Sequence, residues 1–546
     1  MLAAMAPSAQ AQNPPSAGSL QQQIERERQQ QLPQRVAPEK PAAPAEMKPS
    51  GITVTVKQFR FAGNTLIASE QLAPIVAEYL DRPLDFAQLQ VAATAVANAY
   101  RENGWVIRAY LPQQDIQNGI VTLQIAEAVF GKLRLEGALV RLAPAIVLTS
   151  FDAQQKSGEP LNSDALDRAL LLADDLPGVT VAGTLRPGAN EYETDLVVKL
   201  ADEPLMVGEV AADNTGSRST GSDRLTASLG FNSPFGLGDQ LSGNLIHTEG
   251  SDYARLAWSL PVGSEGWRAG LNATQLDYRL VAAEFKALAA KGNSRTFGLD
   301  ASYPIIRSRL KNLYLSLAYD RKAFDNQANA ATTTRYDIDS VTVGLMGNLF
   351  DTLGGGGANS VSVAWTQGKV ELGTLDTSEN ASVAGRFDKL RWNLSRQQVV
   401  TPDVSLFALY SGQRANQNLD SSEKFYLGGA NGVRAYPASE AGGSDGQMLN
   451  LELRWKLPYG LTATAFHDWG RITQFKDHFA GADIPNTYRL RGHGLSLAWQ
   501  GPLGMNLKAT WARRGGSNPN ADAATGKDQD GSFDQNRWWF TASLPF

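Results

Sequence analysis

From residue 205 to the C-terminus, the chain consists of short segments in which small or apolar residues alternate with polar ones. Leu313 to Tyr319 and Val361 to Trp365 are examples, and Gly, Asn, Asp and Ser separate such segments. A period of two places alternate side chains on opposite faces of a β-strand. About sixteen segments are present, with roughly 21 residues for each strand and its connection, which matches membrane-crossing strands of about 9–11 residues.

The sequence contains no apolar stretch that approaches the roughly 20 residues of a membrane-spanning helix. A chain without such helices can cross a membrane only as a closed barrel, because lipid offers no partners for backbone polar groups. A soluble domain of β-sandwiches or propellers is the alternative. No propeller repeat is visible, and about 340 residues would be unusually large for one soluble β core. The sequence therefore predicts a mainly β fold, with a 16-stranded transmembrane antiparallel β-barrel over residues 204–546.

The chain ends on a strand pattern that places Phe540, Leu544 and Phe546 on one face. A terminal Phe on such a strand resembles the assembly signal of bacterial outer-membrane barrels. We expect these three residues to serve as that signal, so the barrel-assembly machinery that inserts the chain is an expected partner, as is outer-membrane lipid.

Two small α/β units precede the barrel, at residues 52–127 and 128–203. In the first unit a strand is expected from Ile52 to Phe61, Ser69 is expected to cap a helix, and Asp85 begins a second helix. Two further strands complete a β-α-α-β-β order, and the second unit repeats this order. Two copies of one supersecondary order form an internal repeat.

The N-terminal region divides into three parts. Residues 1–11 look like a signal-peptide remnant, because Ala9 and Ala11 form an A-x-A cleavage pattern. Residues 12–31 contain a segment rich in Gln, Glu and Arg that reads as a short helix without a core of its own. Residues 32–51 are rich in Pro and predict an extended linker, although composition alone also fits a disordered tail.

The composition argues against several classes of function. The net charge of -5 lacks the basic excess of a nucleic-acid binder, so no nucleic-acid partner is expected. The chain has no Cys, and its four His residues show no metal-ligand spacing. No nucleophile-elbow Ser is visible, and the glycine run at 354–357 lacks the Lys and Ser/Thr of a phosphate loop. We therefore expect neither an enzyme nor any cofactor or metal.

Two short strings in the barrel region carry isolated charges. One runs from Gly428 to Pro437 and contains Arg434 among Gly, Ala and aromatic residues. The other is Phe466 to Gly470, in which Asp468 stands on a predicted strand. An Arg–Asp pair could pin a long loop inside the lumen of a barrel, which would make a removable obstruction.

Together these features resemble the two-partner secretion transporters of Gram-negative bacteria (TpsB, ShlB/FhaC/HecB-like), over nearly the whole chain. The string Val433 to Tyr436 resembles the V-R-G-Y motif of the sixth extracellular loop in the wider superfamily, with Ala435 in place of Gly. The first α/β unit resembles the family's first POTRA domain in these residues: Asn103-Gly104-Trp105, Leu111-Pro112-Gln113-Gln114, Ile116, Asn118-Gly119 and Val121-Thr122-Leu123.

The resemblance implies a lock between the loop and the barrel wall, in which Arg434 at the loop tip meets Asp468. In a wet lumen such a pair contributes about 0–1 kcal/mol, whereas loss of one partner from a desolvated pair costs about 3–5 kcal/mol. Ala435 suggests that its position does not need a positive φ. The residues assigned to the lumen loop lock are Val433, Arg434, Ala435, Tyr436, Asp468 and Gly470.

The resemblance also implies that residues 12–31 form a helix that plugs the barrel, and that the two α/β units are periplasmic POTRA domains. The expected function is secretion of an unfolded partner exoprotein (TpsA-type) across the bacterial outer membrane, by a monomer. A barrel-assembly factor of the same superfamily is one alternative, and a passive solute porin is another. An outer-membrane hydrolase is disfavoured because no catalytic constellation is visible. The sequence does not identify the exported protein.

Overall fold

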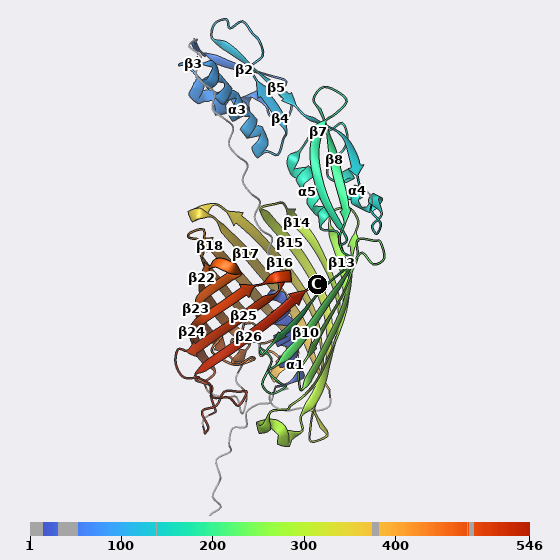
Figure 1. The fold of residues 1–546 in the computed structure, drawn as a ribbon, viewed down its shortest axis with the longest axis vertical. Helices are drawn as coiled ribbons and strands as arrows, with labels where there is room; N and C mark the ends of the chain where they lie inside the picture. The colour runs from blue at the N-terminus through green and yellow to red at the C-terminus, as the bar shows by residue number, and fades with distance from the viewer. Residues whose placement is uncertain are drawn as a thin grey trace, which may run out of the picture.

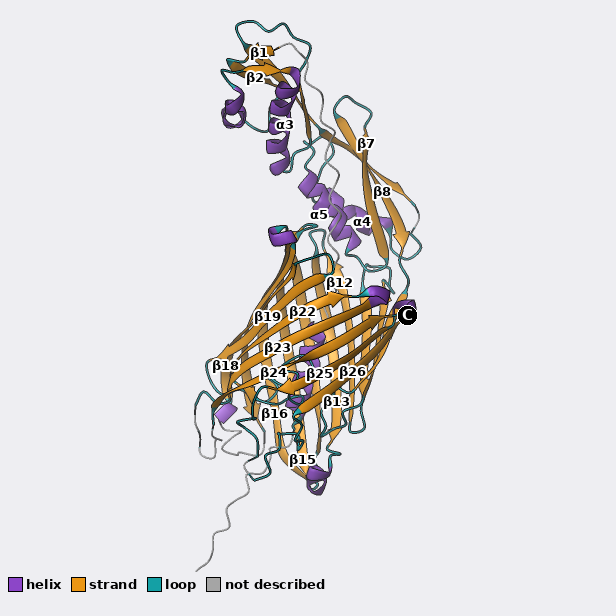
Figure 2. Cartoon of the chain, turned by 60° about the vertical axis from the view of Figure 1, so that its left-hand side comes forward, coloured by secondary structure: helices purple, strands orange, loops and turns teal. Residues whose placement is uncertain are grey.

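The computed structural model describes residues 15–30, 53–137, 139–373, 382–477, 479, 485–522 and 524–546. The predicted signal remnant and the Pro-rich linker lie outside the described residues. Two small α/β units sit beyond one end of a large β-barrel, and helix α1 (Ala17–Gln30) lies inside the barrel (Figures 1 and 2). The C-terminus lies at the barrel end that faces the two units.

The barrel is a closed antiparallel sheet of sixteen strands, in which the first, β9, pairs with the last, β26. The predicted fold class is thereby confirmed. The strands are β9 Met206–Asp213, β10 Arg224–Asn232, β11 Gln240–His247, β12 Ser251–Val262, β13 Trp267–Arg279, β14 Lys291–Arg307, β15 Lys311–Ala328, β16 Ala331–Asp351, β17 Gly357–Leu372, β18 Gly385–Val399, β19 Val404–Ala415, β22 Asp445–Lys456, β23 Leu461–Thr473, β24 Thr487–Gln500, β25 Asn506–Arg514 and β26 Asn536–Pro545.

The alternation in the sequence becomes an apolar outer wall and a mainly polar inner wall. On β24, Leu495 and Leu497 point outward and are 57% and 48% exposed, whereas Ser496 between them faces inward and is buried. Lipid accepts the outward side chains, and the interior tolerates hydroxyls and amides. Phe540, Leu544 and Phe546 also point outward, and the backbone of Phe546 pairs with Gly208 of β9.

Unit 1 (residues 53–127) packs its helices on a three-stranded sheet of order β2-β5-β4, beside the small sheet β1-β3. Its elements are β1 Thr53–Thr55, β2 Gln58–Ala62, α2 Ser69–Leu72, the 3₁₀ helix η1 Ala73–Tyr79, β3 Pro83–Asp85, α3 Phe86–Glu102, β4 Ile107–Tyr110 and β5 Ile120–Glu127. The second helix was predicted to begin at Asp85, and in the structure Asp85 is its cap, because its carboxylate accepts the Gln88 N–H at 2.8 Å.

Two local predictions for unit 1 were wrong. The strand expected from Ile52 to Phe61 is two strands, because the chain turns where Val56 is buried and Lys57 donates its N–H to the Gly119 carbonyl at 2.8 Å. Ser69 does not cap α2 but is its first residue, and Ala68 occupies the cap position.

Unit 2 (residues 129–202) has a sheet of order β6-β8-β7. Its elements are β6 Val129–Glu136, α4 Pro144–Asp152, α5 Ser163–Asp174, β7 Val179–Pro187 and β8 Glu193–Asp202. Asp195 is buried in β8, where it accepts the Lys132 N–H at 2.8 Å and the Arg134 guanidinium at 2.7 Å. These two bonds hold the pKa of Asp195 below its ordinary value.

Unit 2 docks on the near end of the barrel through α5 and the residue that follows it. Asp175 accepts both ends of the Arg307 guanidinium at 2.6 and 2.7 Å, and the Arg307 side chain is buried. Arg168 donates to the Pro304 carbonyl at 2.9 Å. These contacts fix unit 2 against the turn between β14 and β15, at the mouth of the barrel. The remaining 3₁₀ helices are η2 Ala283–Leu288, η3 Leu353–Gly355, η4 Pro458–Gly460 and η5 Pro502–Gly504.

Candidate functional site: the occupied lumen

A long loop between β19 and β22, residues 416–444, folds back into the barrel. Two short strands inside it, β20 (Phe425–Tyr426) and β21 (Gly442–Gly443), pair with each other. The predicted lock residues Val433, Ala435 and Tyr436 are almost fully buried. They belong to an apolar cluster shared with the inner wall, whose members are Phe425, Leu427, Val433, Ala435, Tyr436, Ala441, Met448, Phe466, Ile472, Tyr488, Leu490 and Ala512.

The tip of this lumen loop is bound to β23 by Arg434 and Asp468. The Arg434 guanidinium donates from Nη2 to Asp468 Oδ1 at 2.8 Å and from Nε to Oδ2 at 3.0 Å. The backbone N–H of Arg434 also donates to Oδ2 at 3.0 Å. The structure therefore brings the two predicted partners together in a two-pronged contact, which is the geometry that a guanidinium and a carboxylate favour.

Other groups on the wall complete the environment of the pair. Arg434 Nη1 donates to Glu452 on β22 at 2.8 Å, and the guanidinium carbon lies 3.5 Å from the centroid of the Phe466 ring. Asn450 donates to Asp468 Oδ1 at 2.7 Å. The Arg434 side chain is 6% exposed and that of Asp468 is 0% exposed. The pair is therefore desolvated. Loss of one partner is expected to cost about 3–5 kcal/mol, rather than the ~0–1 kcal/mol of a pair in a wet lumen.

The small residues around the tip allow its close approach to the wall. A Cβ on Gly470 would lie 2.6 Å from Leu427, and one on Gly492 would lie 2.7 Å from the Ala435 Cβ. Ala435 is not among the described residues with a positive φ. The methyl group that replaces the motif's Gly is therefore accommodated because Gly492 stands opposite it on β24.

Several residues that hold the loop carry no local signal in the sequence. Arg514 on β25 donates to the Ala435 carbonyl at 3.3 Å and lies 4.6 Å from the Tyr436 ring centroid. Trp539 on β26 donates to the Arg434 carbonyl at 2.8 Å. These residues, like Glu452 and Asn450, are recognisable only once strand pairing places them beside the loop.

A second ionic contact anchors the earlier part of the loop. Glu423 is buried and binds Lys322 of β15 at 2.6 Å and Lys389 of β18. Lys389 also donates to the Glu423 carbonyl at 3.2 Å. The loop is thus fastened to the inner wall at two places, by Glu423 on β15 and β18 and by Arg434 on β22 and β23.

Helix α1 lies between the lumen loop and the wall. Arg26 donates to the Tyr426 carbonyl of the loop at 2.5 Å. Glu27 pairs with Arg224 of β10 at 2.5 Å, and Gln21 donates to Thr296 of β14 at 2.7 Å. Polar side chains of α1 therefore bind the helix to both the lumen loop and the barrel wall.

The helix also has an apolar side. Ala17 and Leu20 are buried in a cluster with wall residues such as Leu276 and Phe324, and Ile24 packs against that cluster. The Gln, Glu and Arg content of the helix suits a wet lumen, and Leu20 and Ile24 are its main apolar residues. These apolar contacts form because inward aromatic and aliphatic residues of the wall gather at this level of the barrel.

The described residues contain no candidate for two other kinds of feature. No described helix is long and apolar enough to cross a membrane. No group of three or more His, Asp or Glu side chains in the described ranges is placed to hold a metal ion. His467, which adjoins Asp468, is exposed on the outer wall.

The chain is similar to known proteins over most of its length. Residues 193–497 match the family described as haemolysin secretion/activation protein ShlB/FhaC/HecB, and residues 54–128 match the ShlB-type POTRA domain. The heme/hemopexin transporter protein HuxB of Haemophilus influenzae is 27% identical over 84% of this chain and 83% of its own length.

Two further relatives are similar at a comparable level. The outer membrane transporter CdiB of Dickeya dadantii is 24% identical over 84% of this chain and 81% of its own length. The solved structure of CdiB from Escherichia coli aligns over 100% of both chains with a TM-score of 0.73 and 21% identity. That similarity shows a shared fold.

Proposed function

Because the chain belongs to the ShlB/FhaC/HecB family of outer-membrane two-partner secretion transporters, we propose that it captures an unfolded partner exoprotein with its periplasmic POTRA domains and passes it through the barrel. One observation carries this proposal. Helix α1 and the lumen loop lie inside the barrel, where side-chain contacts hold them in place. Both segments can move without breaking the strand ladder that keeps a barrel closed.

The relatives indicate the class of cargo. Their names describe a heme/hemopexin transporter, a haemolysin transporter and the outer membrane transporter CdiB. We propose that the partner of this chain is a secreted protein. We also propose that the chain acts as a monomer without enzymatic activity, and that the assembly machinery recognises its terminal strand at Phe540, Leu544 and Phe546.

The open edge of strand β7 in unit 2 is a suitable place for capture. An extended chain can add to a free sheet edge by main-chain hydrogen bonds. The other edge strand, β6, is partly covered, because Phe130 exchanges backbone bonds with Gly158 and Glu159 at 2.8 and 2.9 Å. The edge of β7 that faces away from β8 is accessible, and Leu185 on this strand is 45% exposed.

The hydrogen-bond alternation along β7 identifies the donors that could bind a partner. The N–H of Glu203 donates to the Gly178 carbonyl. The backbone N–H groups of even-numbered β7 residues therefore point toward β8, and those of odd-numbered residues point away from it. The outward N–H of Val181 is already bound by Asp174 at 3.0 Å. The N–H of Leu185 is therefore a better candidate than that of Val181.

Leu185→Pro is expected to weaken binding of an unfolded N-terminal fragment of the partner by roughly tenfold, the effect of one lost hydrogen bond. The proline ring removes an outward donor and leaves the bonds to β8 intact. Fluorescence anisotropy with the full-length transporter in detergent measures the affinity. Val181→Pro should have a smaller effect on binding.

Leu185→Ala is the matched control, because it keeps the N–H and removes only the side chain. It should bind the fragment nearly as well as the wild type. Equal affinities for Leu185→Pro and the wild type would exclude this edge and would leave the edges of unit 1, β2 and β4, as the candidates.

A further inference from the structure

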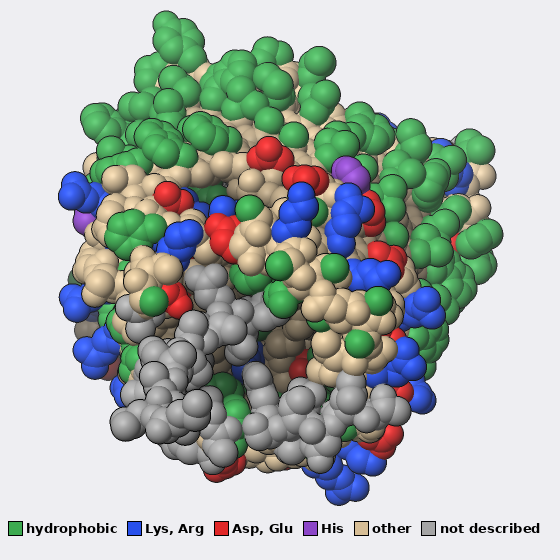
Figure 3. Space-filling view, turned by 90° about the horizontal axis from the view of Figure 1, so that it is seen from below, with side chains coloured by type: hydrophobic (Ala, Val, Ile, Leu, Met, Phe, Trp, Pro, Cys, Tyr) green, Lys and Arg blue, Asp and Glu red, His purple; other side chains and the backbone are tan. Residues whose placement is uncertain are grey.

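Four outward-facing arginines gather at the end of the barrel that is remote from the POTRA domains. They are Arg471 on β23, Arg489 and Arg491 on β24, and Arg513 on β25, and all four are exposed. Arg471 and Arg489 are direct partners in the strand register. Like charges opposite each other across a ladder are destabilising unless a counter-charge is present. A space-filling view of this end shows Lys and Arg side chains around the rim (Figure 3).

This cluster lies directly above the lipid-facing surface. Along the outer face of β24, Arg489, Arg491 and His493 are followed by Leu495 and Leu497, which are 57% and 48% exposed. Such a change from basic to apolar side chains marks the boundary between the headgroups and the hydrocarbon. Because the POTRA domains are periplasmic in this family, this boundary belongs to the outer leaflet.

Within the described ranges, no acidic side chain forms an ion pair with any of the four arginines. The contrast with β15–β17 is clear, because there outward cations at the same end of the barrel have carboxylate partners. Those ion pairs are Arg321–Asp337, Arg335–Asp325 and Lys369–Glu371. The rim of β23–β25 therefore carries a concentration of positive charge that the described part of the protein does not neutralise.

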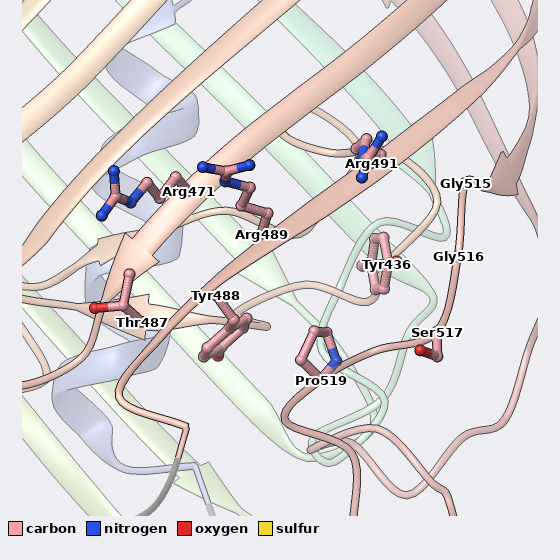
Figure 4. A pocket seen from close by; sticks show the side chains of 10 residues that line it. All are labelled: Tyr436, Arg471, Thr487, Tyr488, Arg489, Arg491, Gly515, Gly516, Ser517 and Pro519. Atoms are coloured by element: carbon pink, nitrogen blue, oxygen red, sulfur yellow. The ribbon is translucent and has the colours of Figure 1, made fainter.

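A pocket of about 520 Å³ opens among these side chains (Figure 4). Arg471, Arg489 and Arg491 line it, together with residues of the segment that follows β25. The ladder between β24 and β25 ends here, where the Gly515 N–H donates to the Arg491 carbonyl at 2.9 Å. Tyr436 of the lumen loop also lines the pocket.

We propose that Arg471, Arg489 and Arg491 bind the phosphorylated headgroup of lipid A, the phosphoglycolipid of the outer leaflet. The guanidinium fork matches a phosphate group and stays charged at all relevant pH values. Basic pockets at a membrane surface bind phosphorylated headgroups in this way. The acyl chains would lie along Leu495 and Leu497. This assignment does not depend on the proposed transport function.

Native mass spectrometry of the purified full-length chain, titrated with diphosphoryl lipid A in detergent, tests the assignment. The variant Arg471→Gln/Arg489→Gln/Arg491→Gln is expected to bind roughly 100-fold more weakly, because each Arg near an anionic headgroup contributes about a factor of five. The control Arg321→Gln/Arg335→Gln/Lys369→Gln removes three cations on β15–β17 and should bind like the wild type. Heat-modifiability checks that both variants are folded.

Two further arms distinguish the source of the phosphate. Wild-type protein should bind dephosphorylated lipid A as weakly as the triple variant binds the intact lipid. Inorganic phosphate at millimolar concentration should not displace intact lipid A. Equal binding by the triple variant and the control would overturn the proposal. Displacement by inorganic phosphate would also overturn it, because the site would then be one for simple anions.

Discussion

Arg434→Ala and Asp468→Ala are each expected to abolish secretion, or to reduce it strongly, while the protein still reaches the outer membrane as a heat-modifiable barrel. Removing one partner leaves the other buried and unpaired, at a cost of about 3–5 kcal/mol. That cost changes the ratio of docked to undocked loop by a factor of more than about 100. The strand ladder does not use these side chains, so the barrel remains closed. A secretion assay with the partner protein measures the effect.

The double alanine variant should be no worse than either single variant, because one missing partner already breaks the contact. Lys369→Ala/Glu371→Ala removes an exposed ion pair on the outer wall and should secrete normally. The charge swap Arg434→Asp with Asp468→Arg should recover little, because Glu452 and the Arg434 N–H also bind in the native arrangement. Normal secretion by either single variant, or fully additive losses, would show that the pair does not act as a lock.

Deletion of residues 12–31 is expected to raise the ion conductance of the protein in planar bilayers several-fold. The helix fills part of the lumen and is held by side-chain contacts, chiefly through Gln21, Arg26 and Glu27. The helix takes no part in the strand ladder that closes the barrel, so the barrel should stay folded without it. Conductance at the intact level would mean that the helix does not obstruct the pore.

Two single substitutions in α1 provide a matched comparison. Arg26→Ala removes the bond to the lumen loop and should increase the frequency of open events. Arg28→Ala removes a side chain that is 48% exposed and pairs with Glu25 within the helix, so it should leave conductance unchanged. Equal effects of the two substitutions on conductance would show that contact with the lumen loop does not hold the helix in place.

The sequence predicted the barrel well because its signal is repeated. A period of two over about sixteen segments leaves few alternatives for a chain with lipid on one side. The single strand expected from Ile52 to Phe61 was wrong, because the turn at Val56 depends on Gly119, which is far along the chain. A local pattern cannot report a break that a distant backbone group causes.

The same distinction applies to the occupied lumen. Arg434 and Asp468 were found because each stands in a recognisable string. Glu423 and its partners Lys322 and Lys389 were missed, because each is an ordinary charged residue until the sheet register brings the three together. Their association is a property of the closed barrel rather than of any segment.

Whether the lumen carries the partner protein can be tested by cross-linking, because the natural chain contains no Cys. Thr366 on β17 faces inward and is buried, whereas the adjacent Trp365 faces outward and is 43% exposed. A photo-activated cross-linker is attached to a single Cys that replaces Thr366 or Trp365. Cross-linking is then triggered while a fusion of the partner protein is stalled during secretion. Cross-links from position 366 and none from position 365 are predicted. Cross-links from position 365 alone would contradict passage of the partner through the barrel.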